Sequence, residues 1–197
     1  MFVDIYNTDK KYSIIYADPP WSYRNMGNIQ ATATSHYHTM RQEDIENMGQ
    51  RIKEITNDDC MLFMWCTFPK LQEGLNAIKA WGFEYKTVGF NWIKKNKNGT
   101  NFFGVGWYTK SNSEVCLIGV KGKPIKRSNS VSQIIETIRE EHSKKPDVVR
   151  EKIVEFCGDV PRIELFARQH AEGWDCWGDE CGETKDNNTS SLQTEEE

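Results

Sequence analysis

The stretch Tyr12-Ser-Ile-Ile-Tyr-Ala-Asp-Pro-Pro-Trp21 decides the fold of this chain. Its first six residues favour a β-strand, and the two prolines end that strand because they lack N–H donors and fix φ. Asp18 is therefore predicted at the carboxyl end of a strand, the edge where open α/β sheets bind ligands. The carboxylate and a carbonyl of Asp18 or Pro19 can accept both hydrogens of an exocyclic amine, while the ring of Trp21 or Tyr23 covers a planar base.

The composition is that of one soluble globular domain with a core of its own. The 197 residues are 38% hydrophobic and 27% charged, and no apolar run approaches the roughly 20 residues of a membrane span. The amino-terminal residues lack the basic and apolar segments of a secretory signal, so we expect a cytoplasmic protein. The six cysteines show neither Cys-x-x-Cys nor zinc-finger spacing, which predicts buried, reduced thiols and no metal site.

Hydrophobic periodicity predicts alternating strands and helices, and hence a mostly parallel sheet with helices on both faces. The expected strands cover 12–17, 60–66, 83–93, 114–120 and 162–168. Four helices are expected. The first begins at a capping box over 39–42 and ends at Ile55, and the second begins after Pro69. The other two cover 130–139 and 147–157.

The sequence Asp18-Pro-Pro-Trp21 after Ile15-Tyr-Ala17 resembles the signature of the MT-A-type adenine-N6 methyltransferases. These enzymes use S-adenosylmethionine (SAM) and act on RNA in eukaryotes and often on DNA in bacteria and phages. The resemblance implies a Rossmann-like SAM-dependent methyltransferase fold that is circularly permuted, with the catalytic motif N-terminal and the SAM-binding strand C-terminal. We expect a methyltransferase domain over 1–181 and a disordered acidic tail over 182–197.

The resemblance also gives roles to individual residues. The catalytic motif consists of Asp18, Pro19, Pro20 and Trp21. Positions implied for the cofactor are Asp4, Ile5, Asp18, Lys145, Arg168, His170, Asp179 and Glu180. The last two are acceptors suited to the ribose hydroxyls. Tyr37 matches an aromatic residue near the acceptor base, and it lies in a polar segment over 22–40 that suits a lid.

The charge distribution points to a nucleic-acid partner. The net charge is −4, but residues 94–127 hold eight basic residues against Glu114 alone, so the rest carries −11. Such asymmetry can present a basic face to phosphates. In 94–113 lysines alternate with aromatic residues, which suits nucleic acid and equally suits a hairpin whose aromatics seat it on the core. The nucleic-acid interpretation assigns substrate contacts to Tyr23, Tyr37, Lys94, Lys95, Lys97, Trp107 and Lys110.

The sequence thus predicts a site-specific DNA adenine-N6 methyltransferase that uses SAM. DNA is favoured over RNA because the chain is compact and shows no RNA-binding module or partner-binding extension. RNA adenine as the acceptor, and a non-catalytic nucleic-acid-binding subunit of a methyltransferase complex, remain open as alternatives. The sequence also leaves open whether the chain acts alone, as a homodimer or as a heterodimer.

Overall fold

The computed structural model describes residues 1–23, 39–106, 108–140 and 144–181. The expectations placed on Tyr37, Trp107, most of the segment 22–40 and the tail 182–197 lie outside these residues. In chain order the elements are β1 (Tyr12–Ala17), α1 (Gln42–Asn47), α2 (Gly49–Glu54), β2 (Thr56–Cys66), the 3₁₀ turn η1 (Phe68–Lys70), α3 (Leu71–Ala80), β3 (Glu84–Lys95), β4 (Ser113–Lys121), β5 (Ile134–Ile138), α4 (Val148–Cys157), β6 (Arg162–Leu165) and β7 (Asp175–Trp177).

The strands of the described residues form one seven-stranded sheet in the order β5-β3-β4-β2-β1-β6-β7. Parallel pairs predominate, as expected: β1 pairs in parallel with β2 and β6, β3 with β5, and β6 with β7. Strand β4 runs antiparallel to both β2 and β3, because a hairpin reverses the chain between β3 and β4. The predicted α/β class is confirmed, and the sheet is a mixed one.

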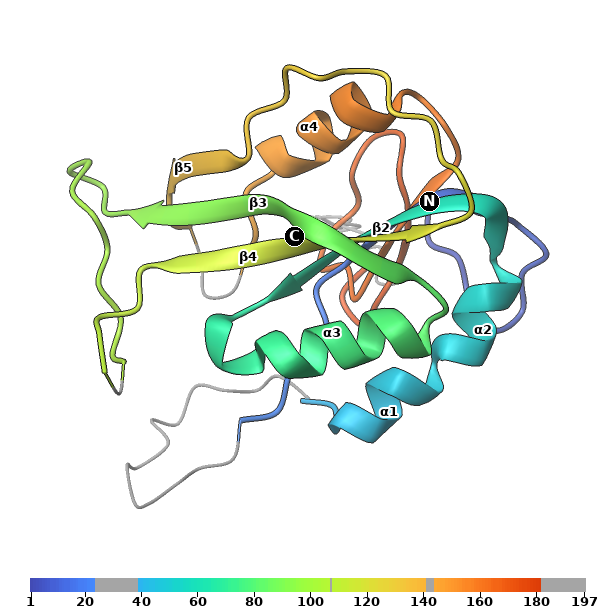
Figure 1. Ribbon diagram of the computed structural model, residues 1–197, viewed down its shortest axis with the longest axis horizontal. Coiled ribbons are helices and arrows are strands. Elements are labelled where there is room, and N and C mark those ends of the chain that lie inside the picture. Colours follow the sequence, from blue (N-terminus) through green and yellow to red (C-terminus); the bar gives the residue numbers. More distant parts are fainter. Residues whose placement is uncertain (24–38, 107, 141–143, 182–197) are drawn as a thin grey trace, which may run out of the picture.

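Helices cover both faces of the sheet (Figure 1), with α1, α2 and α3 on one face and α4 on the other. Alternation along the strands explains this, because neighbouring residues of a strand point to opposite faces. Ile15 and Ala17 of β1 belong to the core cluster that contains residues of α1 to α3. Ile14 and Tyr16 belong to the second cluster, which contains residues of α4.

Strand β1 is interior and buried, and it lies between β2 and β6. The chain leaves β1 toward β2 through α1 and α2, and returns much later to β6 on the other side. Connections therefore diverge on either side of the β1 carboxyl end, which creates the crevice where open α/β sheets bind ligands. Asp18 follows directly at that end, as the sequence predicts.

The helix predicted over 130–139 is wrong, because this segment contains the edge strand β5. Its residues Ile-Ile-Glu-Thr-Ile are mostly β-branched, which favours a strand. Ile135 is buried at 3% exposure, whereas Ile134 and Ile138 are 45% and 49% exposed. The spacing of the isoleucines fits a helix as well as a strand, but pairing with β3 decides the outcome.

Two helix and strand boundaries also differ from the prediction. The helix expected after 39–42 is split into α1 and α2 at Met48, and no side-chain hydrogen bond caps α1 within the described residues, so the predicted capping box is wrong. Gly49 at the start of α2 allows close packing against the end of α3, since a Cβ there would lie 2.4 Å from the carbonyl oxygen of Ala80. The last predicted strand ends at Leu165 rather than at 168, because Phe166 takes a φ of +59° that breaks strand geometry.

Candidate active site

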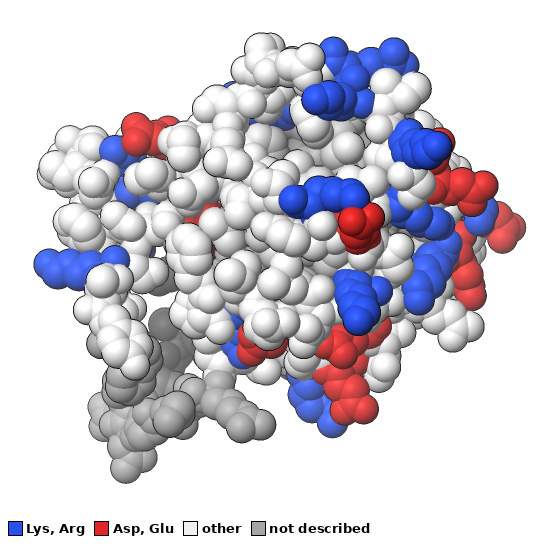
Figure 2. Space-filling view, viewed as in Figure 1, with Lys and Arg blue, Asp and Glu red and all other residues white. Residues whose placement is uncertain are grey.

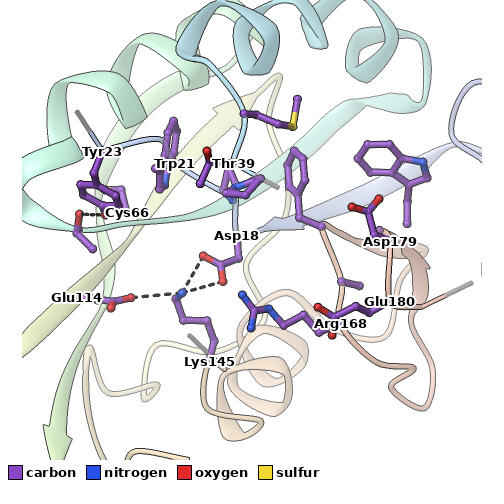
Figure 3. Close-up of a pocket in the computed structure, with 18 residues that line it drawn as sticks. Asp18, Trp21, Tyr23, Thr39, Cys66, Glu114, Lys145, Arg168, Asp179 and Glu180 are labelled. Carbon is purple, nitrogen blue, oxygen red and sulfur yellow. Dashed lines mark hydrogen bonds and ion pairs between the residues drawn. The ribbon is translucent and has the colours of Figure 1, made fainter. Parts of the chain in front are cut away.

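A pocket of about 400 Å³ lies at the carboxyl ends of β1, β2, β6 and β7 (Figure 3). Strand β4 contributes its amino end, because it runs antiparallel to β2 and so starts at the same edge. The lining residues are Asp18, Pro19, Pro20, Trp21, Tyr23, Thr39, Met40, Cys66, Thr67, Glu114, Lys145, Phe166, Ala167, Arg168, Trp177, Gly178, Asp179 and Glu180. The volume suits a small organic ligand.

The turn after β1 is held by hydrogen bonds within the turn and to Met40 and Trp65. The Trp21 N–H donates to the Pro19 carbonyl at 2.8 Å, and the Met40 N–H donates to the Pro20 carbonyl at 2.9 Å. The indole N–H of Trp21 donates to the Trp65 carbonyl at 3.0 Å, and the Trp21 ring is buried. The turn is therefore rigid, and each proline carbonyl keeps a second lone pair for a ligand.

A row of alternating charges crosses the floor of the pocket. The Lys145 ammonium donates to both carboxylate oxygens of Asp18, at 2.8 Å and 2.7 Å. The same nitrogen lies 3.3 Å from the Glu114 carboxylate, which also bonds to the ammonium of Lys94. The Asp18 side chain is 23% exposed and that of Lys145 is 11% exposed. Figure 3 shows Lys145 between the two acids, with Asp18 facing the pocket.

The pKa values in this row follow from burial and from the neighbouring charges. Burial raises the pKa of Asp18, and the Lys145 ammonium opposes that shift. Burial lowers the pKa of Lys145, but the carboxylates of Asp18 and Glu114 outweigh it and hold that pKa above its ordinary value. Burial also raises the pKa of Glu114, yet Lys145 and Lys94 bring it below its ordinary value. Lys145 is therefore charged, and Glu114 is its second counter-ion.

The other wall of the pocket comes from the loops after β6 and β7. Phe166 holds a positive φ, an uncommon state for a bulky residue that marks a functional site when its surroundings enforce it. The rings of Phe166 and Trp177 meet edge to face with centroids 5.4 Å apart. Gly178 lets the two loops approach, since a Cβ there would lie 2.4 Å from the Ala167 carbonyl oxygen.

Most of the residues implied for the cofactor line this pocket, and three do not. Lys145, Arg168, Asp179 and Glu180 are lining residues, but Asp4, Ile5 and His170 are not. The Asp4 carboxylate accepts a hydrogen bond from the Tyr6 N–H at 3.0 Å, so it closes its own turn. The side chain of Ile5 is buried, and His170 Nδ1 lies 3.3 Å from the thiol of Cys176.

The lysines implied for the substrate fall into two groups. Lys94 lies inside the charge row, with its ammonium 4.9 Å from the centroid of the Trp92 ring. Lys95 bonds to the Asn101 side chain at 2.8 Å and lies 3.5 Å from Glu136. Lys97 and Lys110 are exposed on the hairpin between β3 and β4. Lys94 thus contacts the pocket residue Glu114, whereas Lys97 and Lys110 are exposed and the Lys110 ammonium lies 5.2 Å from the centroid of the Phe103 ring.

The hairpin presents aromatic residues outward rather than into the core. Phe102 is partly buried under the Arg139 guanidinium, at 4.1 Å. Phe103 is 55% exposed and Tyr108 is fully exposed. Figure 2 shows lysine and arginine side chains on the hairpin side with few acidic neighbours, whereas the two signs are mixed over α1 to α3. The rings of Phe103 and Tyr108 therefore do not pack into the core of the domain.

Tyr23 stands at the mouth of the pocket and is the implied substrate residue nearest to Asp18 in the chain. Its hydroxyl lies 2.6 Å from the Thr67 hydroxyl. The Lys70 ammonium stands 5.4 Å from its ring centroid. The ring is 52% exposed. It can therefore lie against a planar group that enters the pocket.

Sequence reasoning missed Glu114 as a functional residue. It counted only as the single acid in a basic stretch, although that isolation at the start of a strand is itself a signal. The structure places its carboxylate beside Lys145 at 3.3 Å. Glu164, a second missed acid, is buried in β6 behind the pocket.

The remaining structural expectations can be stated briefly. All six cysteines are buried and free, as predicted. Among the described residues no helix is both long and apolar enough to cross a bilayer. A search of the same residues finds no group of three or more His, Cys, Asp or Glu side chains placed to hold a metal ion.

Comparison with known proteins places the chain in a family. The MT-A70 family model matches residues 12–180. The chain is 36% identical to the type II methyltransferase M.MunI of a Mycoplasma species, covering 89% of this chain and 80% of that protein. This chain therefore belongs to the MT-A70 family, and the resemblance drawn from Asp18-Pro-Pro-Trp21 is confirmed.

Two eukaryotic relatives are more distant. The chain is 26% identical to the human N(6)-adenosine-methyltransferase catalytic subunit METTL3, over 81% of this chain and 26% of that protein. It is 25% identical to a probable MT-A70-like N(6)-adenosine-methyltransferase of rice, over 83% of this chain and 22% of that protein. The chain thus spans about a quarter of these longer relatives.

Proposed function

We propose that this protein transfers a methyl group from SAM to the N6 amine of adenine in DNA. Membership of the MT-A70 family and the names of the relatives support the methyltransferase class and the adenine target. The observation that carries the proposal is the Asp18 carboxylate, which faces the pocket from the carboxyl end of β1. A non-catalytic role is disfavoured because Asp18 and Lys145 are both present and in contact.

The pocket fits SAM by the chemistry of its donors and acceptors. The carboxylates of Asp179 and Glu180 offer acceptors for a ribose diol, and Arg168 offers a cation for a carboxylate. The close approach at Gly178 and the edge-to-face pair of Phe166 and Trp177 form an aromatic wall for a purine. When bound, SAM supplies an electrophilic methyl group. A circularly permuted arrangement of the fold is part of the same proposal, since the catalytic strand comes first and this cofactor wall last.

The first task of the chain is to orient the target amine. Its lone pair is delocalised into the base, so the amine is a weak nucleophile. Asp18 Oδ accepts one hydrogen of the amine, and a carbonyl of the rigid Pro19 turn accepts the other. These bonds aim the lone pair into the pocket, and positioning of this kind supplies much of the rate enhancement in a displacement reaction.

The Lys145 ammonium must release one oxygen of Asp18 before the amine can bind there, because it donates to both oxygens of that carboxylate. Glu114 stands 3.3 Å from the same nitrogen and can receive it. Lys145 then leaves one Asp18 oxygen open to the amine without losing a counter-ion. After transfer, the product ammonium is acidic, and Asp18 Oδ can accept the released proton.

The DNA that accepts the methyl group is held by aromatic and basic side chains outside the charge row. In a duplex the target base must leave the stack, which costs a few kcal/mol. The half-exposed Tyr23 ring offers a stacking surface at the pocket mouth, and Lys97 and Lys110 offer charges to phosphates. DNA is proposed over RNA because the chain is 36% identical to the type II methyltransferase M.MunI over four fifths of that protein, but only 26% identical to METTL3 over about a quarter of it.

Transfer of labelled methyl from SAM to matched, unmethylated DNA and RNA of mixed sequence tests the proposal. The products are digested to nucleosides and separated. N6-methyldeoxyadenosine from DNA alone is the expected result. Label in RNA alone would overturn the acceptor while keeping the chemistry. No label in either nucleic acid, from a protein that binds SAM, would contradict the proposed function of this chain on its own.

A further inference from the structure

A buried ion pair lies directly behind the pocket without lining it. Arg150 Nε donates to one oxygen of Glu164 at 2.6 Å, and Nη2 donates to the other at 2.9 Å. The two side chains are 11% and 10% exposed. Replacing a buried ion pair with apolar residues is often neutral or stabilising, so such a pair is weak evidence for a role in stability. Its location therefore matters more than its energy.

The pair joins the two segments that carry Asp18 and Lys145. Glu164 of β6 lies opposite Tyr16 of β1, two residues before Asp18. Arg150 lies near the start of α4, five residues after Lys145. A bidentate guanidinium–carboxylate pair fixes orientation as well as distance, because both donors must align. It therefore sets the start of α4 against the interior strands β1 and β6.

The same guanidinium also holds the loop that precedes α4. Arg150 Nη1 donates to the Asp147 carboxylate, which accepts a further bond from Gln169 Nε2 at 3.1 Å. Gln169 follows Arg168, a lining residue of the pocket. The loop that ends in Lys145-Pro146 is thus tied to the loop after β6. Both loops border the site, and the Asp147 carboxylate joins them because it accepts from both Arg150 and Gln169.

We propose that Arg150 and Glu164 are positioning residues that place the Lys145 ammonium against Asp18. The inference rests on the proposed function, since it gives the pair a part in methyl transfer. Neither residue touches the pocket, so each acts through Lys145. Without the pair, α4 and its preceding loop shift relative to β1, and Lys145 withdraws from the Asp18 carboxylate.

A purely structural role for the pair predicts a different outcome. In that case apolar replacements of similar size preserve both the fold and the site. The variant Arg150→Met with Glu164→Leu tests this, because it leaves no buried charge without a partner. The exchange also removes equal and opposite charges behind Asp18, so their direct effects on its pKa oppose each other. The charges that act on the Asp18 pKa are then those of Lys145, Glu114 and Arg168, and the pocket is also lined by the acids Asp179 and Glu180.

The measured quantity is the pKa of the Asp18 carboxyl group, obtained from a carbon-13 NMR titration. The Asp18→Asn variant identifies the resonance of that group. We expect this pKa to be higher in the double variant than in the wild type, because Lys145 no longer opposes the effect of burial. The control is Asp159→Asn with Arg162→Met, which removes another arginine–carboxylate pair at the amino end of β6, away from the pocket. An unchanged Asp18 pKa in a folded double variant would overturn the positioning role.

Kinetic measurements on the same proteins separate this inference from the proposed function. The double variant should lose about 10-fold to 100-fold in kcat with little change in KM, as for a small misplacement of a catalytic group. A wild-type protein that transfers no methyl group would defeat the proposed function, while the NMR titration would still decide the positioning role. If the double variant does not fold, Arg150→Lys, which keeps both charges but loses the two-point contact with Glu164, is measured in the same way, and the Asp18 pKa is again expected to rise.

Discussion

The pocket edge and the β3–β4 hairpin are both rich in charged residues, but the charges are buried and paired at the pocket edge and exposed on the hairpin. At the pocket, Lys145, Asp18, Glu114 and Lys94 form one connected row, and each side chain is at most 23% exposed. On the hairpin, Lys97 and Lys110 are exposed and stand beside outward-facing rings. Buried, paired charges hold geometry and tune pKa values, whereas exposed ones attract phosphates. We therefore propose that the pocket edge carries the chemistry and that the hairpin binds nucleic acid.

The largest effect is expected at Asp18. Asp18→Ala should lower the rate of methyl transfer by roughly 10²-fold to 10⁴-fold, because the amine loses its anionic acceptor. The fold and much of the SAM binding should remain. Single-turnover transfer to DNA measures the rate, and calorimetry measures SAM binding. Asp9→Ala, at an exposed acid, is the control. Normal transfer by Asp18→Ala would remove the pocket edge from the chemistry.

The next effect concerns pH. Transfer requires ionised Asp18, and burial raises the pKa of Asp18 while Lys145 opposes that shift. Lys145→Met should therefore raise the Asp18 pKa further and move the acid limb of the kcat profile to higher pH. Glu114→Gln should move the acid limb to lower pH or leave it unchanged, because the negative charge of Glu114 raises the Asp18 pKa. Coincident acid limbs in Lys145→Met and wild type would show that the row does not tune Asp18.

A smaller effect separates the two groups of lysines. Lys97→Ala with Lys110→Ala should weaken DNA binding and lower the salt dependence of log K by about 2, one for each lost phosphate contact. Its kcat should stay normal. Lys94→Met should do the opposite, lowering kcat with little change in the salt slope, because its ammonium pairs with Glu114. Salt titrations of binding to one DNA duplex measure the slopes, with Lys79→Ala and Lys86→Ala as the surface control.

The smallest effect is expected at the tip of the hairpin. Val105 is fully exposed, so Val105→Ser should change the free energy of unfolding by less than about 0.5 kcal/mol. Denaturant unfolding followed by circular dichroism measures this. A loss well above that value would mean that the hairpin tip is packed against something, contrary to the exposure of its side chains.

The sequence predicts the strand ends more successfully than the surroundings of the site. Strand β1 follows from its β-prone run and the two prolines, and β2 from a continuous apolar run over 60–66. These signals are local, so they can be read without knowing the fold. Edge strand β5 is different, because the spacing of its isoleucines fits two periods and only pairing with β3 chooses between them.

The same distinction applies to the site. Asp18 and Lys145 carry local motifs, and the structure brings them together across 127 residues of chain. Glu114 and Glu164 carry no motif, because their roles depend on which strands become neighbours. Lys94 is predicted from a basic, aromatic neighbourhood that suggests phosphate contact, and the pairing of β3 with β4 places it beside Glu114, a contact that no local pattern predicts.

One measurement tests the division of roles most directly. Single-turnover methyl transfer and equilibrium binding are measured on the same DNA duplex for wild type, Asp18→Ala and the variant with Lys97→Ala and Lys110→Ala. The account predicts that Asp18→Ala binds DNA normally but forms almost no N6-methyladenine, while the hairpin variant binds weakly and forms it at the normal rate once saturated. Formation of N6-methyladenine by Asp18→Ala at the wild-type rate would contradict the account.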